Sequence, residues 1–235
     1  MNRKQNPNLQ ILELAVTELG SLAGDMVFVG GCATGLLITD IAAPPIRPTQ
    51  DVDVITEVAS LGAYHRLSEQ LRKRGFKEDQ SPEAPICRWI TAGVVLDVMP
   101  TNSEILGFGN DWYRPALETA ESVILPSGSR IRMVTAPYFL ATKLEAFYGR
   151  GKGDYAASHD MEDIVAVLDG RPSIVDEVKR SNQPLLNYLS AQFAGLLNDR
   201  YFSESLSGHL PGDAASQGRV SFVLKRIEYL ANLMD

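Results

Sequence analysis

The hydrophobic residues of this chain change their spacing near its middle. In the first half they form short runs, such as residues 26–30 and 94–99, or they alternate with polar residues, as in residues 51–55. Both patterns predict buried or half-buried strands. In the second half apolar residues recur every three or four positions, which predicts helices. The pattern therefore predicts a mixed α/β core that is followed by a helical region.

Turn residues separate the expected elements. Thr91-Ala92-Gly93 and Pro126-Ser127-Gly128-Ser129 each lie between two short apolar stretches, which is typical of a hairpin. Residues 42–48 contain three prolines and predict a loop. The expected strands are residues 26–30, 51–55, 76–78, 86–90, 94–99, 122–125 and 131–134. The expected helices are residues 8–23, 33–41, 62–74, 138–150, 159–168, 174–180, 185–198 and 219–234.

The change of pattern divides the chain near residue 136. Residues 1–136 are expected to form the α/β core and residues 137–235 the C-terminal helical region. A chain of 235 residues is long enough for one sizeable domain with a smaller appendage.

Composition narrows the class of protein. The chain is 45% hydrophobic and 22% charged, with a net charge of −7 and a pI near 5.1. This balance argues against a wholly basic nucleic-acid coat, although a local basic patch stays open. The sequence has neither an apolar run long enough to cross a bilayer nor an apolar core near its start, and its two cysteines predict reduced, buried thiols. We therefore expect a cytoplasmic protein that does not enter a membrane.

Three carboxylates fall on predicted strands. Asp51 and Asp53 are two residues apart, so in a strand they project from the same face. Asp97 interrupts an otherwise apolar strand and must find a partner or a site. Carboxylate oxygens are the ligands that hard divalent cations prefer, and neighbouring strands with three of them predict a site for one or two Mg²⁺ ions.

A glycine pair lies just before these carboxylates in the chain. Gly30 and Gly31 follow the strand at 26–30 and precede a predicted helix. Such a turn brings backbone N–H groups close to phosphate oxygens at a helix N-terminus. Taken alone it is more often a plain turn.

Four ordered motifs resemble a known family. They are Gly30-Gly31-x-Ala33 with Arg47-x-Thr49-x-Asp51-x-Asp53, then the strand acid Asp97, then Lys143-x-x-Ala146-x-x-x-Arg150, and finally Asp160-x-x-Asp163. Together they span residues 30 to 163. The set is similar to the DNA polymerase β-like nucleotidyltransferase superfamily, and more closely to the AbiEii/AbiGii-type nucleotidyltransferase toxins.

The resemblance implies a fold and an activity. It implies an α+β fold with a polymerase β-like nucleotidyltransferase core, in which a mixed β-sheet is flanked by helices. The implied reaction transfers NMP from an NTP to a hydroxyl acceptor, a tRNA 3′ end or a protein side chain, and releases pyrophosphate. Mg²⁺ or Mn²⁺ would be the cofactor. ATP and CTP are the nucleotides considered, and a cognate antitoxin would be the partner.

The roles implied for single residues follow the motifs. Asp51, Asp53 and Asp97 would bind the metal, and Asp97 would also help ionise the acceptor hydroxyl. Gly30, Gly31, Arg47 and Thr49 would contact the phosphates. Lys143 and Arg150, on one face of a predicted helix, would clamp the triphosphate. Asp160 or Asp163 would anchor the base, the ribose or the Lys143 ammonium.

Several alternatives stay open from the residues alone. Asp97 could instead be a buried acid paired with Arg88 across the hairpin, and Cys32 is more simply a packed thiol than a nucleophile. At the level of function, the same core suits a small-molecule (aminoglycoside-type) nucleotidyltransferase. A non-catalytic nucleotide-binding module is the alternative from a different class.

Overall fold

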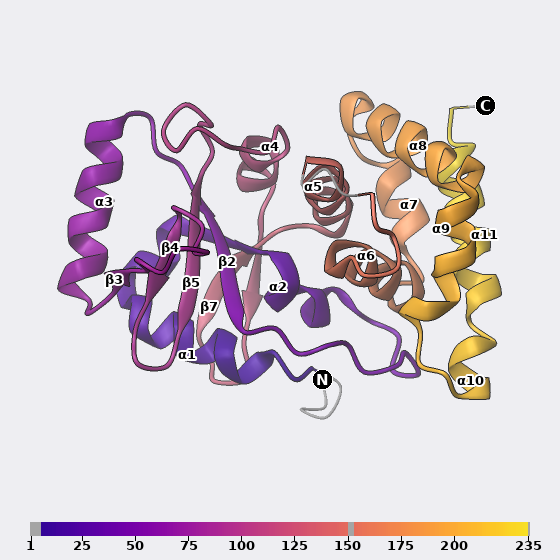
Figure 1. Ribbon diagram of the computed structural model, residues 1–235, viewed down its shortest axis with the longest axis horizontal. Coiled ribbons are helices and arrows are strands. Elements are labelled where there is room, and N and C mark those ends of the chain that lie inside the picture. The colour runs from indigo at the N-terminus through magenta and orange to yellow at the C-terminus, as the bar shows by residue number, and fades with distance from the viewer. Residues whose placement is uncertain (1–5, 150–152, 235) are drawn as a thin grey trace. The chain divides into compact units, whose positions relative to one another are not determined.

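The chain forms two compact units. The structure, a computed structural model, describes residues 6–149 and 153–234. One unit contains the described residues up to Gly35 together with Arg47–Thr135, and the other contains Leu36–Ile46 together with the described residues from Ala136 onward (Figure 1). The expected α+β fold, a mixed sheet flanked by helices and followed by a helical region, is confirmed.

The first unit is built on a seven-stranded mixed sheet with the strand order β3-β4-β5-β2-β1-β7-β6. Strands β2 and β5 are parallel, as are β1 and β7, and all other neighbours are antiparallel. The central strand is β2, which lies between β1 and β5. The strands are β1 Met26–Val29, β2 Asp51–Thr56, β3 Lys77–Glu78, β4 Arg88–Ile90, β5 Val95–Pro100, β6 Glu121–Ile124 and β7 Arg130–Met133.

The burial of these strands explains their sequence patterns. All four residues of β1 are buried, which fits its continuous apolar run. In β2 the valines Val52 and Val54 are fully buried, whereas Asp51 and Asp53 are half-buried. Because successive strand residues point to opposite faces, β2 turns its apolar side to the core and its two carboxylates to the other face.

The helices of the first unit pack around this sheet. They are α1 Leu9–Leu19, the 3₁₀ helix η1 Gly20–Asp25, α2 Gly30–Leu37, whose last two residues belong to the second unit, α3 Leu61–Lys73 and α4 Tyr113–Glu118. The hydroxyl of Ser60 caps α3 by accepting a hydrogen bond from Ala63 N at 3.2 Å. Figure 1 shows α3 beside β3 and β4, where Arg72 bonds Glu78 of β3 and lies over the ring of Trp89 of β4.

One expectation for this unit is wrong, and one helix was not expected. The helix expected at residues 33–41 begins at Gly30 and ends at Leu37. It begins early because Gly30 takes a positive φ of 66°, so the chain passes from β1 into the helix with no loop between them. Helix α4 was not expected, since its six residues are too few to show a helical pattern.

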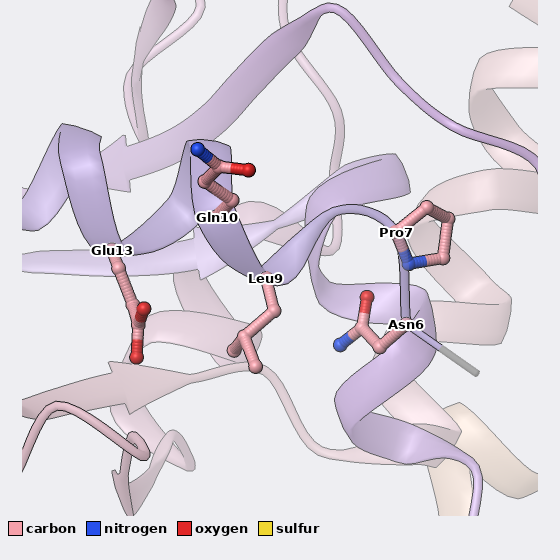
Figure 2. Close-up of a pocket in the computed structure, with 5 residues that line it drawn as sticks. All are labelled: Asn6, Pro7, Leu9, Gln10 and Glu13. Atoms are coloured by element: carbon pink, nitrogen blue, oxygen red, sulfur yellow. The ribbon is translucent and has the colours of Figure 1, made fainter. Parts of the chain in front are cut away.

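A small cavity lies at the start of α1. Its volume is about 220 Å³, and Figure 2 shows the five residues that line it, Asn6, Pro7, Leu9, Gln10 and Glu13. The carboxylate of Glu13 also accepts a hydrogen bond from Ser127 N at 2.9 Å. The lining includes none of the predicted site residues.

The second unit is helical. Its helices are α5 Ala136–Gly149, α6 His159–Gly170, α7 Ile174–Lys179, α8 Gln183–Asn198, α9 Arg200–Ser205, η2 Leu206–His209, α10 Ala214–Gln217 and α11 Val220–Ala231. Side chains of Ser158, Asn182 and Asp213 cap α6, α8 and α10. The expected break at residues 206–217 holds two short helical segments, η2 and α10.

Residues 36–46 belong to the helical unit although they precede most of the sheet in sequence. The backbone N–H groups of Thr39 and Asp40 both donate to Gly170 O at 2.9 Å. Arg171 donates to Leu37 O at 2.7 Å. A single division at residue 136 therefore leaves out this segment, because its hydrogen bonds are made to residues 130 to 134 positions further along the chain.

No helix in the described part of the chain is long and apolar enough to cross a membrane.

Candidate active site

The three strand carboxylates converge on one face of the sheet. Asp53 of β2 and Asp97 of β5 are register partners on parallel strands, so they lie side by side. Asp51 projects from the same face because it is two residues from Asp53. The sequence predicted that Asp51 and Asp53 would share a face, and the pairing of β2 with β5 adds Asp97 to them.

A guanidinium lies between two of these carboxylates. Arg88 of β4 is the register partner of Asp97 across the hairpin. Its Nε donates to Asp97 Oδ1 at 2.8 Å, and its Nη2 donates to Asp97 Oδ2 at 2.8 Å and to Asp51 Oδ2 at 3.1 Å. Hydrogen bonding to Asp97 raises the pKa of Arg88 above its usual value, despite the opposing effect of burial. Arg88 is therefore held as a cation by both carboxylates.

The pairing bears directly on the expected metal site. Of the two alternatives for Asp97, the ion pair with Arg88 is the one present in the structure. Within the described residues, no three His, Cys, Asp or Glu side chains are arranged to hold a metal ion. The cluster nevertheless holds a cation, since two of the three carboxylates contact the guanidinium of Arg88 and the three together outnumber it in charge. Carboxylate oxygens are ligands that a divalent cation accepts, and a metal site at Asp51, Asp53 and Asp97 stays a prediction.

Asp53 lies against the start of α2. A Cβ atom added to Gly30 would lie 1.8 Å from Asp53 Oδ2, so only glycine fits at this position. The close approach places the carboxylate of Asp53 at the N-terminus of the helix, where its negative charge is favourable. Register explains the approach, because Val29, the residue before Gly30, pairs with Asp53.

Asn8 connects the segments that carry the predicted phosphate contacts. Its Nδ2 donates to Gly31 O and to Arg47 O, both at 3.2 Å, and its Oδ1 accepts from Thr49 N at 2.8 Å. Asn8 is only 2% exposed. One side chain therefore fixes the glycine turn beside the residues that precede β2, and it does so instead of capping α1, at whose N-cap it stands.

The hydroxyl of Thr49 is directed at the carboxylate cluster. Thr49 Oγ1 donates to Asp51 Oδ1 at 2.7 Å. Arg47, two residues earlier, is half-buried. The structure thus brings Gly30, Gly31, Arg47 and Thr49 together with the three carboxylates in one unit. Their contacts with phosphate stay predictions.

Lys143, Asp160 and Asp163 form a separate cluster inside the helical unit. Lys143 of α5 contacts Asp160 Oδ1 at 3.0 Å and Asp163 Oδ2 at 2.7 Å, both on α6. All three residues are buried, with exposures of 9%, 4% and 2%. Of the roles considered for the two acids, anchoring the Lys143 ammonium is the one that the structure contains. Arg150 lies outside the described residues.

Two site residues gave little signal in the sequence. Arg88 was considered only as a structural partner of Asp97, and its contact with Asp51 depends on the side-by-side pairing of β4, β5 and β2. Asn8 precedes a helix, where asparagine usually caps, so its sequence position indicated a different role. A buried asparagine that bonds to two segments distant in the sequence is recognisable only from the folded structure.

Cys87 adjoins the carboxylate cluster but is chemically quiet. It is 3% exposed, and burial, with the nearby charges of Asp97 and Asp53, raises the pKa of its thiol to about 12. Cys32 is fully buried, and its thiol donates to Val29 O at 3.1 Å. Both observations favour packed thiols over nucleophiles, in line with the simpler of the two interpretations of Cys32.

Comparisons with known proteins give distant likenesses of the whole chain. One solved structure is that of a candidate nucleotidyltransferase from Helicobacter pylori, with 13% identity, a TM-score of 0.46, and coverage of 98% of this chain and 96% of that one. Another is JHP933 from Helicobacter pylori, with 12% identity, a TM-score of 0.43, and coverage of 96% and 92%. No family model and no curated protein matches the sequence. The AbiEii/AbiGii resemblance therefore stays a prediction from the four motifs.

Proposed function

We propose that this protein is a nucleotidyltransferase, which transfers NMP from an NTP to a hydroxyl acceptor and releases pyrophosphate. One observation carries the proposal. Asp51, Asp53 and Asp97 share a face of the sheet, with a cation already between two of them and the N-terminus of α2 against the third. Carboxylates gathered in this way next to a helix N-terminus suit a nucleoside triphosphate with its divalent cation.

Mg²⁺, or Mn²⁺ in its place, would be held by Asp51, Asp53 and Asp97. When bound it would neutralise phosphate charge and lower the pKa of the attacking hydroxyl. Asp97 would accept the proton of that hydroxyl as it attacks the α-phosphorus. The new P–O bond then forms as the bond to the pyrophosphate oxygen breaks, and pyrophosphate leaves with the electron pair.

The segments tied by Asn8 would hold the phosphates. The N–H groups of Gly30 and Gly31 at the helix start suit phosphate oxygens, and the guanidinium of Arg47 matches phosphate geometry. Thr49, whose hydroxyl now bonds Asp51, would donate to the γ-phosphate. Asn8 would act as a positioning residue, because it fixes the backbone on both sides of this cradle.

The roles proposed in the helical unit are less direct. Lys143 is held by Asp160 and Asp163, so the cluster carries more negative than positive charge. Such a cluster suits a base or ribose donor group better than bare phosphate, and contact of Lys143 with the triphosphate is proposed on the family resemblance alone. A tRNA 3′ end or a protein hydroxyl is the proposed acceptor. A toxin function with a cognate antitoxin is proposed on the family resemblance alone.

A nucleotide-binding module without catalysis is the second candidate. The ion pair between Arg88 and Asp97 favours it, because a carboxylate that stays paired does not accept a proton from a hydroxyl. The two candidates differ in pyrophosphate release, which only the enzyme would produce.

In the test, the protein is incubated with Mg²⁺ and each α-³²P-labelled NTP, in separate reactions with total tRNA, with lysate protein and with aminoglycosides. Transfer of the label to each acceptor is measured. The Asp53→Asn variant removes one carboxylate charge and keeps its shape. We expect it to lower transfer by more than about 100-fold, since it removes a proposed metal ligand. Asp25→Asn, at an exposed residue of the same unit, is the matched control and should transfer like the wild type.

The outcomes separate the candidates. Label on tRNA or protein that is lost only in Asp53→Asn supports the proposal and identifies the acceptor. Label on an aminoglycoside would replace the macromolecular acceptor with a small one. Nucleotide binding without pyrophosphate release in any reaction would contradict nucleotidyl transfer and favour the binding module.

A further inference from the structure

Arg88 uses the same oxygens that a metal ion would need. Its Nη2 atom contacts Asp97 Oδ2 and Asp51 Oδ2, and its Nε takes the remaining oxygen of Asp97. The side chains are partly shielded, with exposures of 24% for Arg88, 34% for Asp51 and 10% for Asp97. A divalent cation binds carboxylate oxygen at about 2.0–2.6 Å, so on the same oxygens it would lie near the guanidinium and be repelled by its positive charge.

The two cations therefore compete for the same carboxylates. While Arg88 stays, it takes one lone pair on each oxygen of Asp97, and a metal on the remaining lone pairs would lie close to the positive guanidinium. A metal that binds Asp51 and Asp97 together is therefore favoured when Arg88 gives up its three hydrogen bonds to them. Asp97 is buried, so its carboxylate would lose its counter-ion if Arg88 left alone, and departure of Arg88 and arrival of the metal are therefore coupled.

The displaced guanidinium needs a new anion. Arg88 is the more exposed member of its pair with Asp97, so it has solvent on one side. Planar guanidinium groups bind phosphate with two parallel hydrogen bonds. A nucleoside triphosphate that binds with its metal provides both groups: the metal is a cation for the carboxylates, and the phosphates are an anion for Arg88.

We propose that Arg88 is an internal counter-ion that competes with the metal for Asp51 and Asp97 and moves to the nucleotide phosphates when metal and nucleotide bind together. The inference rests on the proposed function, whose site it describes. It makes metal binding weak in the nucleotide-free protein and makes metal and nucleotide binding mutually cooperative.

The experiment measures Mn²⁺ binding to the full-length protein by the electron paramagnetic resonance signal of free Mn²⁺. Wild type, Arg88→Gln and Arg88→Lys are titrated alone and with the α,β-methylene analogues of ATP and CTP. Arg72→Gln is the matched control, because it removes the same charge from the same unit, at a pair with Glu78 on α3 and β3.

We expect Arg88→Gln to bind Mn²⁺ at least tenfold more tightly than wild type without nucleotide. Arg88→Lys keeps the charge but loses the planar guanidinium, so its Mn²⁺ affinity should lie between those of wild type and Arg88→Gln. Adding an analogue should tighten Mn²⁺ binding strongly in wild type and much less in Arg88→Gln. Arg72→Gln should match wild type in both conditions.

Equal Mn²⁺ affinity in wild type and Arg88→Gln, or no Mn²⁺ binding in any of these proteins, would overturn the inference. If Arg88→Gln does not fold, as circular dichroism would show, Arg88→Lys decides, and affinity no higher than wild type overturns it. Tighter Mn²⁺ binding in the Arg88 variants, together with no transfer by the wild type to any acceptor, would contradict the proposed function and keep the inference. Transfer by the wild type, together with unchanged Mn²⁺ affinity in the variants, would keep the proposed function and overturn the inference.

Discussion

At the scale of single residues, the candidate site depends on a glycine that has no substitute. Gly30 combines a φ of 66° with a Cα that lies against the carboxylate of Asp53. The sequence marked this glycine as part of a turn, and the structure shows why the turn needs it. Two separate costs meet at this position, backbone strain and collision with a site residue.

Gly30→Ala should therefore be more harmful than other substitutions of glycines with positive φ. We expect it to lower the free energy of unfolding by about 1–2 kcal/mol from strain alone, with a further loss from the displaced carboxylate. Gly107→Ala is the control, since Gly107 has a φ of 75° and nothing within 4 Å of the added Cβ. Urea unfolding of both variants measures the difference, and equal losses would show that the Asp53 contact costs nothing.

Cys87 is expected to make the stability of the protein depend on pH. Its thiol pKa is about 12 in the folded protein and 9.0 without the fold, so the unfolded chain loses this proton first. The contribution to stability is fully present below pH 9 and declines as pH rises toward 12, by at most about 1.4 kcal/mol per pH unit. Unfolding by urea at pH 8, 9 and 10 should show a steeper decline in wild type than in Cys87→Ala. Equal slopes would contradict the raised pKa.

At the scale of elements, the central strands were the most predictable part. Strands β1, β2 and β5 were expected from apolar runs and alternation, and the structure has them within two residues of those bounds. The position of Asp97 beside Asp53 was less accessible, because strand order depends on pairings between distant segments. The start of α2 was missed for a local reason, since a glycine pair suits both a turn and an abrupt helix start.

The second unit depends on one arginine that joins three of its elements. Arg219, at the start of α11, donates to Asp169 of α6 and to Asp40 of the segment 36–46, at distances of 2.5–2.8 Å. Asp169 is 1% exposed, so loss of its partner leaves a buried charge. We expect Arg219→Ala to destabilise the protein by about 3 kcal/mol.

Arg200→Ala is the matched control in the same unit. Arg200 is 76% exposed and lies 3.9 Å from Glu204, so its removal should change stability by less than about 0.5 kcal/mol. Thermal unfolding of both variants compares them. A destabilisation of similar size in the two would show that the Arg219 contacts add nothing beyond a surface ion pair.

At the scale of the whole molecule, the chain passes between its two units three times, near residues 35, 46 and 135. Both candidate clusters lie within single units, the carboxylates in one and Lys143 with its two acids in the other. The inserted segment 36–46 could not be predicted from the linear pattern, because its partners, such as Gly170, lie far along the chain.

The discontinuous second unit leads to a prediction about fragments. A fragment of residues 136–235 lacks the segment that pairs with Gly170 O and with Arg219. We expect its melting temperature to be lower, by more than about 5 °C, than that of the same fragment joined to residues 36–46 through a flexible glycine–serine linker. Circular dichroism measures both, and equal melting would mean that the segment does not stabilise the helical unit.

The parity of β2 and β5 sets a limit on how this chain can change length. Asp51, Asp53 and Asp97 share a face because successive residues of a strand alternate between the two faces of the sheet. Losing one residue inside either strand would turn the acids after the deletion toward the apolar core. Loops such as residues 101–110 have no such count to keep. Over evolutionary time, insertions and deletions would therefore be tolerated in such loops and eliminated within β2 and β5.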